Sequence, residues 1–240
     1  MGTNGSLGNI NLQRRRQDSS KSSEKAVSLA VLVCLLSHFC FLPSAGAAIG
    51  RFLIDPATIL ETADRMDFVG HNAFAIERTP RGIFLRSTPQ GSSSGLYTKL
   101  DVDGRSLTNV QWTWRVDAMQ ASADLRTLAK EDSSATIFFI FGEPSFINRD
   151  VPTLAYVWSA TPVADGTVFN SARFASLRYI QLHGARAIGT WQSETRNVVR
   201  DYETAFGTEP GTLRYVAILN DNDQTGEPCS ALFGPILDAR

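Results

Sequence analysis

The feature that most constrains the fold is a series of short hydrophobic runs, each separated from the next by turn-forming residues. In residues 110–116, apolar and polar side chains alternate with period two, as in a strand that buries one face. Similar runs recur about every 10 residues from Phe74 onward, without the alternation of strands and helices that a parallel sheet requires. The sequence therefore predicts a mainly β protein, an antiparallel β-sandwich of the jelly-roll kind with one or two short helices.

Turn residues divide the individual strands. A hairpin is predicted between residues 74–77 and residues 83–86, because Pro80 and Gly82 between them favour a tight turn. Further strands are predicted at residues 96–102, 110–116, 136–141, 154–158, 177–182 and 214–219. The turn-rich segment 89–95 is expected to form a loop that leads into the strand beginning at residue 96.

Helical signals are few. Residues 195–206 have apolar side chains at helical spacing, and Gly207 follows as a stop signal. Residues 124–131 have a weaker pattern that fits a short helical turn. Residues 231–237 are expected to close the chain as an edge strand, where Pro235 is tolerated.

Residues 1–47 have the composition of a bacterial-type export signal. Basic residues precede an apolar run over residues 26–42, and small residues follow at 45–48. Cleavage is expected after Ala47, which leaves a single domain over residues 48–240, located in the periplasm or secreted. The alternative is an uncleaved, single-span membrane anchor, although the run is short for a hydrocarbon core of about 30 Å.

The remaining chain is slightly acidic. Of 23 Lys and Arg and 24 Asp and Glu, five and two lie in residues 1–47, so residues 48–240 have a net charge of −4. Nucleic acid is therefore not an expected partner, and membrane contact is expected only through an uncleaved leader. Cys229 is the only cysteine after residue 47, and we expect a buried, free thiol.

Tryptophans are the first candidates for ligand contacts. Trp112 and Trp114 lie on the same face of one predicted strand. There they either form a stacking platform for sugar rings or belong to the core, which is the commoner place for large aromatic side chains. Trp158 and Trp191 lie near predicted turns, so these two are the tryptophans expected to be exposed.

Two arginines close to these aromatic residues in the sequence complete the predicted ligand-binding set. Arg115 and Arg196 have guanidinium groups that donate two hydrogen bonds at once, which suits sugar hydroxyls. The alternative is that they form ion pairs with neighbouring carboxylates such as Asp201, which is the more common role of surface arginines.

Residues 220–226 are the strongest candidate for a metal site. Asp221 and Asp223 alternate with amide side chains ahead of a glycine, and such oxygens coordinate hard cations, so Ca²⁺ is the cofactor considered. The segment lacks the distal Glu of an EF-hand loop, and the same residue types also form ordinary turns. Zinc is not expected, because His71 and His183 are the only histidines after the leader and have no ligand motif around them.

The sequence assigns no catalytic residue. It contains no His-Glu-x-x-His, which binds zinc in metalloproteases, and no Glu-x-Asp-x-x-Glu, which supplies the carboxylates of many jelly-roll glucanases. Carboxylates from separate strands can still converge in a folded domain. Glu77, Asp101, Asp132 and Glu143 are candidates for such a pair.

Four motifs, in their order along the chain, resemble the bacterial domain-of-unknown-function family 3047. They are the Trp-x-Trp-Arg-Val of residues 112–116, Tyr-Val-Trp-Ser at 156–159, the segment 191–202, and the Asx-rich segment 220–226. The resemblance covers nearly the whole chain after the leader, and it implies a relative of the galactose-binding-like jelly rolls, which often bind carbohydrates. The chain departs from the family pattern at residues 131–133, at Asn220 and at Gln224.

Three functions remain as hypotheses. The first is a non-catalytic, secreted or periplasmic β-sandwich that binds a glycan or another cell-envelope component through exposed tryptophans and Asx-rich loops. The second is an accessory or scaffolding subunit of a larger envelope protein complex. The third is a carbohydrate-active hydrolase or lyase, which requires two carboxylates that face each other in a cleft.

Overall fold

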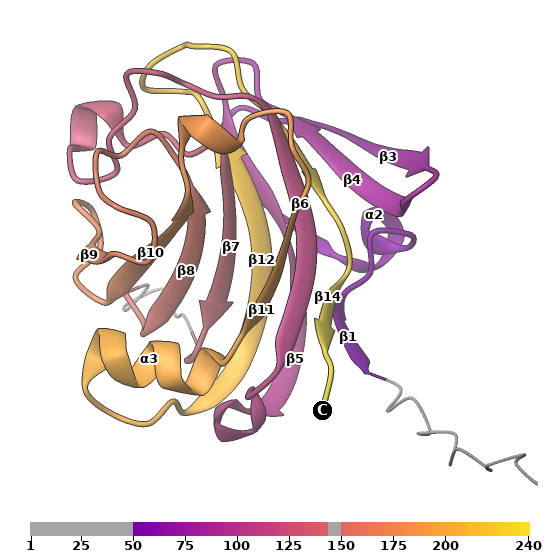
Figure 1. Cartoon of the computed structure of the whole chain (residues 1–240), viewed down its shortest axis with the longest axis vertical. Helices are drawn as coiled ribbons and strands as arrows, with labels where there is room; N and C mark the ends of the chain where they lie inside the picture. Colours follow the sequence, from indigo (N-terminus) through magenta and orange to yellow (C-terminus); the bar gives the residue numbers. More distant parts are fainter. Residues whose placement is uncertain (1–49, 144–149) are drawn as a thin grey trace, which may run out of the picture. The chain divides into compact units, whose positions relative to one another are not determined.

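The computed structural model describes residues 50–143 and 150–240, and the predicted leader at residues 1–47 lies outside this part of the chain. The described residues form two seven-stranded sheets, called sheet A and sheet B here, that pack against each other (Figure 1). The predicted antiparallel β-sandwich with short helices is therefore confirmed. Among the described residues, no helix is long and apolar enough to cross a membrane.

Sheet A has the strand order β1–β14–β6–β13–β4–β3, and β11 pairs with the opposite edge of β6. Its strands are β1 (Arg51–Ile54), β3 (Ala73–Thr79), β4 (Gly82–Thr88), β6 (Val110–Ala118), β11 (Gln192–Arg196), β13 (Ser230–Phe233) and β14 (Ile236–Asp238). The hairpin of β3 and β4 turns at Pro80 and Arg81, with Gly82 at a positive φ of 133°, as the turn residues predict.

Sheet B has the strand order β2–β5–β12–β7–β8–β10–β9. Its strands are β2 (Asp64–Val69), β5 (Ser93–Asp103), β7 (Ala135–Ile140), β8 (Thr153–Trp158), β9 (Val168–Asn170), β10 (Leu177–His183) and β12 (Thr212–Asp221). All neighbours are antiparallel except β8 and β10, which are parallel. A parallel pair cannot be joined by a tight turn, and residues 159–176 make the long crossover that includes β9.

The main helix, α3 (Val198–Phe206), begins later than residue 195, where the sequence predicts its start. Thr195 and Arg196 belong to β11 instead, because they pair with β6. The Asn197 side chain caps the helix by accepting a hydrogen bond from the Arg200 N–H, and Gly207 ends it with φ of 74°. The shorter helices are α2 (Ile59–Thr62), η1 (Gly104–Ser106), η2 (Leu128–Lys130), which is the turn predicted within residues 124–131, and η3 (Ala185–Ala187).

The end of the chain corrects one prediction. Residues 231–237 do not form an edge strand, because β13 and β14 both pair with β6 inside sheet A. Gly234 and Pro235 interrupt the run between these two strands, and the Gly234 N–H donates to the Thr113 carbonyl at 2.8 Å. Pro235, which has no N–H, therefore lies at an irregularity where the regular ladder is already broken.

The prediction that residues 89–95 form a loop is wrong for the end of this segment. Its last three residues belong to β5, whose first residue is Ser93. Gly95 allows the neighbouring strand β12 to approach closely, because a Cβ at this position would lie 2.4 Å from the Ile218 carbonyl oxygen. A glycine that marks close backbone approach looks like a loop residue in the sequence.

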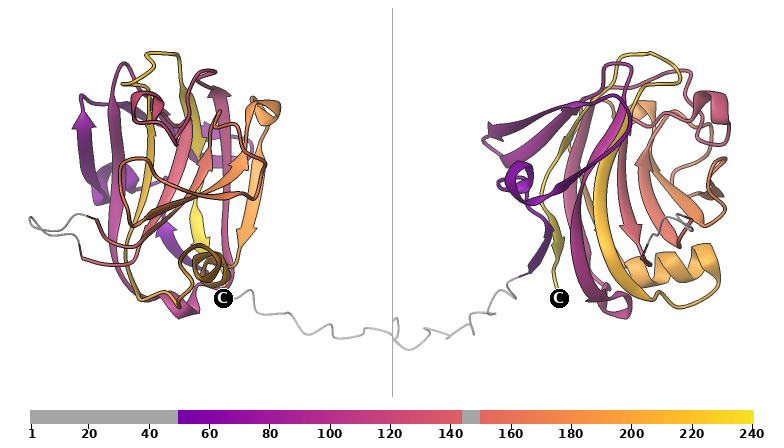
Figure 2. Two further views of the ribbon diagram at one scale, coloured as in Figure 1. Left: turned by 90° about the vertical axis from the view of Figure 1, so that its left-hand side faces the viewer. Right: turned by 180° about the vertical axis from the view of Figure 1, so that it is seen from behind.

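Aromatic rings fill the core between the sheets. Contacts at ring-centre distances of 5.1–5.9 Å, mostly edge to face, join Trp112, Trp114, Phe139, Tyr156 and Trp158. Helix α3 contributes Val198 and Tyr202 to the same core. The left view of Figure 2 looks onto the side that carries β9, β10 and α3. The opposite face of sheet B, which points away from this core, holds the candidate site.

Candidate functional site

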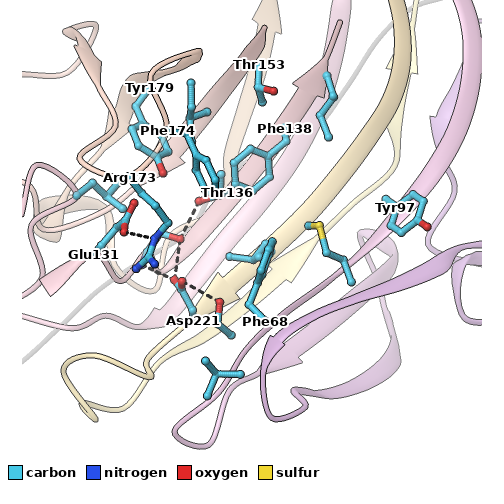
Figure 3. Close-up of a pocket in the computed structure, with 18 of the residues that line it drawn as sticks. Phe68, Tyr97, Glu131, Thr136, Phe138, Thr153, Arg173, Phe174, Tyr179 and Asp221 are labelled. Atoms are coloured by element: carbon cyan, nitrogen blue, oxygen red, sulfur yellow. Dashed lines mark hydrogen bonds and ion pairs between the residues drawn. The ribbon is translucent and has the colours of Figure 1, made fainter. Parts of the chain in front are cut away.

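The outer face of sheet B carries a groove with a volume of about 1010 Å³ (Figure 3). This is at the upper end of the range of about 300–1,000 Å³ that is usual for ligand pockets. Its lining comes from six neighbouring strands of sheet B, from β2 across to β10. Neighbouring strands lie about 4.8 Å apart, so the groove extends about 24 Å across the sheet.

Strand alternation explains how β7 builds both the groove and the core. Thr136, Phe138 and Ile140 line the groove. Ile137 and Phe139, the residues between them, are buried in the core. Successive side chains of a strand point to opposite faces of the sheet. One face of β7 therefore packs against the core between the sheets, and the other face lines the groove.

Aromatic side chains contribute six residues to the lining of the groove. They are Phe68, Tyr97, Phe138, Phe174, Tyr179 and Tyr215. Phe68 is 59% exposed, which is unusual for a large apolar side chain. Tyr97 and Tyr215 contact each other edge to face at 5.7 Å, and the Tyr215 hydroxyl donates to the Glu143 carboxylate. The groove thus offers apolar ring surfaces together with hydroxyl groups.

Charged side chains also line the groove, and acidic ones outnumber basic ones. They are Arg65, Asp67, Glu131, Asp150, Arg173, Asp221 and Asp223. Both arginines have acidic partners, because the Arg173 Nε lies 2.7 Å from a Glu131 oxygen and the Arg65 Nε lies 3.3 Å from an Asp67 oxygen. Figure 3 shows Glu131, Arg173 and Asp221 together at one end of the groove. We call Glu131, Asp221 and Asp223 the acidic end.

Burial dominates the electrostatics of the acidic end. It raises the pKa of Glu131, against the opposing effect of the Arg173 guanidinium. It also raises the pKa of Asp221 to about 8, and the nearby carboxylates of Asp132 and Asp223 act in the same direction. The Asp221 carboxyl group accepts hydrogen bonds from the Ser133 N–H at 2.7 Å and from the Ser93 hydroxyl at 3.2 Å. Asp221 is therefore largely protonated at neutral pH.

The Asx-rich segment forms a turn next to the acidic end. Asp132 holds this turn by accepting hydrogen bonds from the backbone N–H groups of Gln224 and Thr225, at 3.2 and 2.6 Å. Oxygens of Asp132, Asp221 and Asp223 lie within 4.8 Å of one another. Three carboxylates at this spacing could hold a cation, so the structure adds Asp132 to the predicted calcium ligands. Ca²⁺ at Asp221 and Asp223 stays a prediction.

Two acceptor atoms at this turn have no donor among the described residues. They are Oδ1 of Asp223 and Oε1 of Gln224, and both atoms are buried. Both residues line the groove. Buried acceptors are normally hydrogen-bonded, so an empty acceptor in a groove marks a place where a donor from a ligand fits.

Ser93 has the sequence context of a serine nucleophile but not its structure. Residues 91–95 match the string Gly-x-Ser-x-Gly with Ser93 at its centre. In hydrolases this serine lies on a sharp turn from a strand into a helix, whereas Ser93 is the first residue of the long strand β5. Its hydroxyl donates to the Asp221 carboxyl group rather than to a histidine.

Three of the tryptophans predicted as ligand contacts lie in the core. Trp112, Trp114 and Trp158 are 3%, 0% and 0% exposed. For Trp112 and Trp114 this is the core alternative that the sequence left open, whereas the predicted exposure of Trp158 is wrong. Trp158 shares its face of β8 with the buried Tyr156, two residues earlier, so nearness to a turn did not bring it to the surface.

The remaining predicted contacts lie on sheet A, away from the groove lining. Trp191 is half-buried and packs against Phe84, with ring centres 4.2 Å apart, while the Arg115 guanidinium lies 5.0 Å from its ring centre. Arg115 also pairs with Asp117 at 2.6 Å. Arg196 pairs with Asp201 at 2.7 Å, which is the ion-pair alternative of the sequence analysis.

Of the residues that line the groove, the sequence analysis named Asp221 and Asp223 as metal ligands but missed the aromatic ones, although one signal for those exists. On β5 and β12, Tyr97 and Tyr215 occupy positions whose strand neighbours are buried, as at Leu96 and Val216. A half-buried tyrosine next to core residues in a strand indicates that the outer face of the sheet carries packed or ligand-contacting side chains and not only solvent-exposed ones. The sequence analysis weighted tryptophans instead.

A model of the family described as "Protein of unknown function (DUF3047)" matches residues 64–237. No protein with a curated description matches the chain.

Solved structures that are similar to the chain share little sequence with it. The family 11 carbohydrate-binding module of a cellulosomal cellulase from Clostridium thermocellum is 9% identical with a TM-score of 0.38, covering 80% of this chain and 95% of that chain. The K3 cleaved adhesin domain of Lys-gingipain from Porphyromonas gingivalis is 15% identical with a TM-score of 0.33, covering 75% and 92%. The β-1,2-glucanase from Parabacteroides distasonis is 13% identical with a TM-score of 0.34, covering 73% of this chain and only 22% of the enzyme.

Proposed function

We propose that this chain, which belongs to the DUF3047 family of proteins of unknown function, binds a glycan in the groove on the outer face of sheet B. The observation that carries the proposal is the aromatic lining of that groove. A sugar ring has apolar C–H faces and a rim of hydroxyl groups. It therefore needs flat apolar surfaces beside hydrogen-bonding groups, and the groove offers both.

The dimensions of the groove favour an elongated ligand. Its lining spans six strands, or about 24 Å, which is longer than a single sugar ring. Figure 3 shows Tyr97 at one side of the groove, Phe138 nearer the middle, and Phe174 beyond Phe138. Rings distributed in this way can contact successive units of an oligosaccharide, so we expect affinity to rise with chain length.

The proposal includes export and a role without catalysis. A leader at residues 1–47 would place the groove outside the cytoplasm, where polysaccharides of cell envelopes are found. Cys229, the only cysteine after the predicted leader, is a buried free thiol, which is compatible with an oxidising compartment because residues 48–240 have no second cysteine to pair with it. An envelope protein partner, the alternative from the sequence, stays a prediction.

The acidic end favours a second candidate function, a carbohydrate-active hydrolase or lyase. A general acid must hold its proton at the working pH, and Asp221, with its pKa of about 8, does so. Glu131 and Asp223 are further carboxyl groups in the same groove. Asp221 is almost fully buried and already hydrogen-bonded to Ser93 and Ser133, which makes binding the better-supported function.

Glycan arrays and product analysis test both functions. We expect the purified protein to retain oligosaccharides of at least one backbone class and to bind hexamers more tightly than dimers. Failure to bind any class across a broad array contradicts the proposal. Incubation of a bound oligosaccharide, followed by analysis of chain length, separates the two candidates, because shortened products would assign a catalytic role to the acidic end.

A further inference from the structure

Both positively charged side chains of the groove already pair with protein carboxylates, so neither is available to a negatively charged ligand. Of its seven ionisable side chains, five are acidic and two are arginines, and of the five acidic groups Asp221 is largely protonated at neutral pH. Arg173 is engaged by Glu131, and Arg65 by Asp67 as well as by the Asn72 carbonyl oxygen at 2.9 Å. A ligand carboxylate or sulfate would have to displace a protein carboxylate from one of these arginines and would lie close to the other acidic groups.

The acceptors that lack a donor point to the complementary ligand chemistry. Asp223 Oδ1 and Gln224 Oε1 are buried, adjacent along the chain and without a hydrogen-bond donor among the described residues. A hydroxyl or ammonium group of a ligand supplies the missing donors, whereas a carboxylate or sulfate brings only further acceptors. Because Asp223 is acidic and lies in a partly buried setting, an ammonium group gains an additional electrostatic attraction there.

From these contacts we infer that the groove selects glycans by charge: it binds amine-bearing sugars more tightly than neutral ones and rejects acidic ones. Asp223 and Gln224 are the specificity-determining residues, and the aromatic lining is shared by all three classes of ligand. This inference rests on the proposed function, because it concerns the same groove. It adds the substrate class, which the aromatic rings alone do not determine.

The experiment uses hexamers of β-1,3-linked and β-1,4-linked glucose in three forms that differ in one group. They are the unmodified sugar, the 2-amino-2-deoxy form, and the form oxidised at C6 to a carboxylate. Affinities are measured with EDTA present, at a pH where the amine is protonated. On the backbone that binds, we expect the amine form to bind about fivefold or more tightly than the unmodified form, and the carboxylate form to bind at least about tenfold more weakly.

Two variants connect the preference to its residues. Asp223→Asn keeps the shape of the side chain and removes its charge, so we expect the advantage of the amine form to fall to about twofold or less, while the affinity for the unmodified hexamer changes little. Asp101→Asn is the matched control: it removes the same charge from β5, and Asp101, whose side chain is 79% exposed, does not line the groove. It should retain the full preference. A higher salt concentration should reduce the advantage of the amine form in the wild-type protein.

The possible outcomes separate the inference from the proposed function. If no form of either hexamer binds, the charge selection fails, whereas the proposed function fails only if the broad glycan array is blank as well. If the three forms bind alike, or if the carboxylate form binds best, the charge selection is wrong and glycan binding stands. If EDTA abolishes binding and Ca²⁺ restores it, the acidic end is a cation site, and that result also overturns the inference.

Discussion

Phe138 and Phe139 are neighbours in β7 and point to opposite faces of sheet B. Phe139 is fully buried in the core between the sheets, whereas Phe138 is partly exposed and lines the groove. The two residues therefore have different surroundings: Phe139 packs between the sheets, whereas Phe138 packs against a second hydrophobic cluster that includes Leu177 and Tyr179 and also faces the groove.

Alanine substitution of each phenylalanine should have a different effect. We expect Phe138→Ala to weaken glycan binding by about tenfold or more and to lower the free energy of unfolding by about 1–3 kcal/mol, because Phe138 packs against the second hydrophobic cluster but is not fully buried. Phe139→Ala should lower the free energy of unfolding by about 3–5 kcal/mol, because it opens a cavity in the core. Calorimetric titration and urea unfolding measure the two effects. Equal loss of affinity in two folded variants would contradict the assignment of faces.

The tryptophans distinguish binding in the groove from binding at the site that the sequence predicts. Trp191 contacts Phe84 and Arg115 on sheet A, and no tryptophan is among the residues that line the groove. We expect Trp191→Ala to lower the melting temperature and to leave glycan affinity within about twofold. Saturating glycan should also leave the tryptophan emission maximum unchanged. A large blue shift on binding would indicate that the glycan contacts a tryptophan, as the sequence-based site predicts, and would contradict binding in the groove.

Asp221 gives stability a specific pH dependence. Its pKa is about 8 in the folded protein and about 4 in the unfolded chain, so the folded state holds an extra proton between these values. The stabilisation is fully present below about pH 4, decreases as the pH rises, and is lost as the pH passes through about 8. Asp221→Asn mimics the protonated form and lacks this dependence.

The quantity to measure is therefore the difference in the free energy of unfolding between the wild-type protein and Asp221→Asn. Denaturant unfolding from about pH 5 to pH 9 should show the wild-type protein losing stability relative to Asp221→Asn, by at most about 1.4 kcal/mol per pH unit. Asp101→Asn, which changes an exposed carboxylate, is expected to follow the wild-type curve. A stability difference that does not change with pH would show that Asp221 is ionised throughout.

Gly95 is predicted to be intolerant of any side chain. A Cβ at residue 95 would lie 2.4 Å from the Ile218 carbonyl oxygen, so β5 and β12 would have to separate. We expect Gly95→Ala to lower the free energy of unfolding by about 1–3 kcal/mol. Gly211→Ala is the control, because a Cβ there meets no atom within 4 Å and the φ of Gly211 is not in the left-handed region. Equal stability of the two variants would contradict the close approach.

The sequence predicted the layers better than the site, for a physical reason. Period-two alternation, as in residues 110–116, reports which side chains are buried, and the strands predicted from the sequence are present as β3 to β8, β10 and β12. The groove lies on a second face that is also apolar. In residues 136–141, the pattern cannot distinguish a face covered by the other sheet from a face that a ligand covers.

The partners in the groove also come from distant parts of the chain. Asp221 and Ser133 are hydrogen-bonded although 88 residues separate them, and Glu131 meets Arg173 across 42 residues. No local pattern predicts such contacts. Short strands with little apolar content, such as β2 and β11, were missed for a related reason: pairing with β5 and β6, rather than burial, holds them in place.

The parallel pairing of β8 and β10 requires a long connection, and part of this connection lies beside the groove. The crossover over residues 159–176 contains Arg173 and Phe174, which form one wall of the groove, whereas Val168, in β9 of the same crossover, packs against the core between the sheets. Substitutions or insertions close to Arg173 and Phe174 can therefore reshape that wall while Val168 keeps its contact with the hydrophobic interior. Among relatives, differences in ligand preference should be concentrated in this connection, on a scaffold that itself hardly changes.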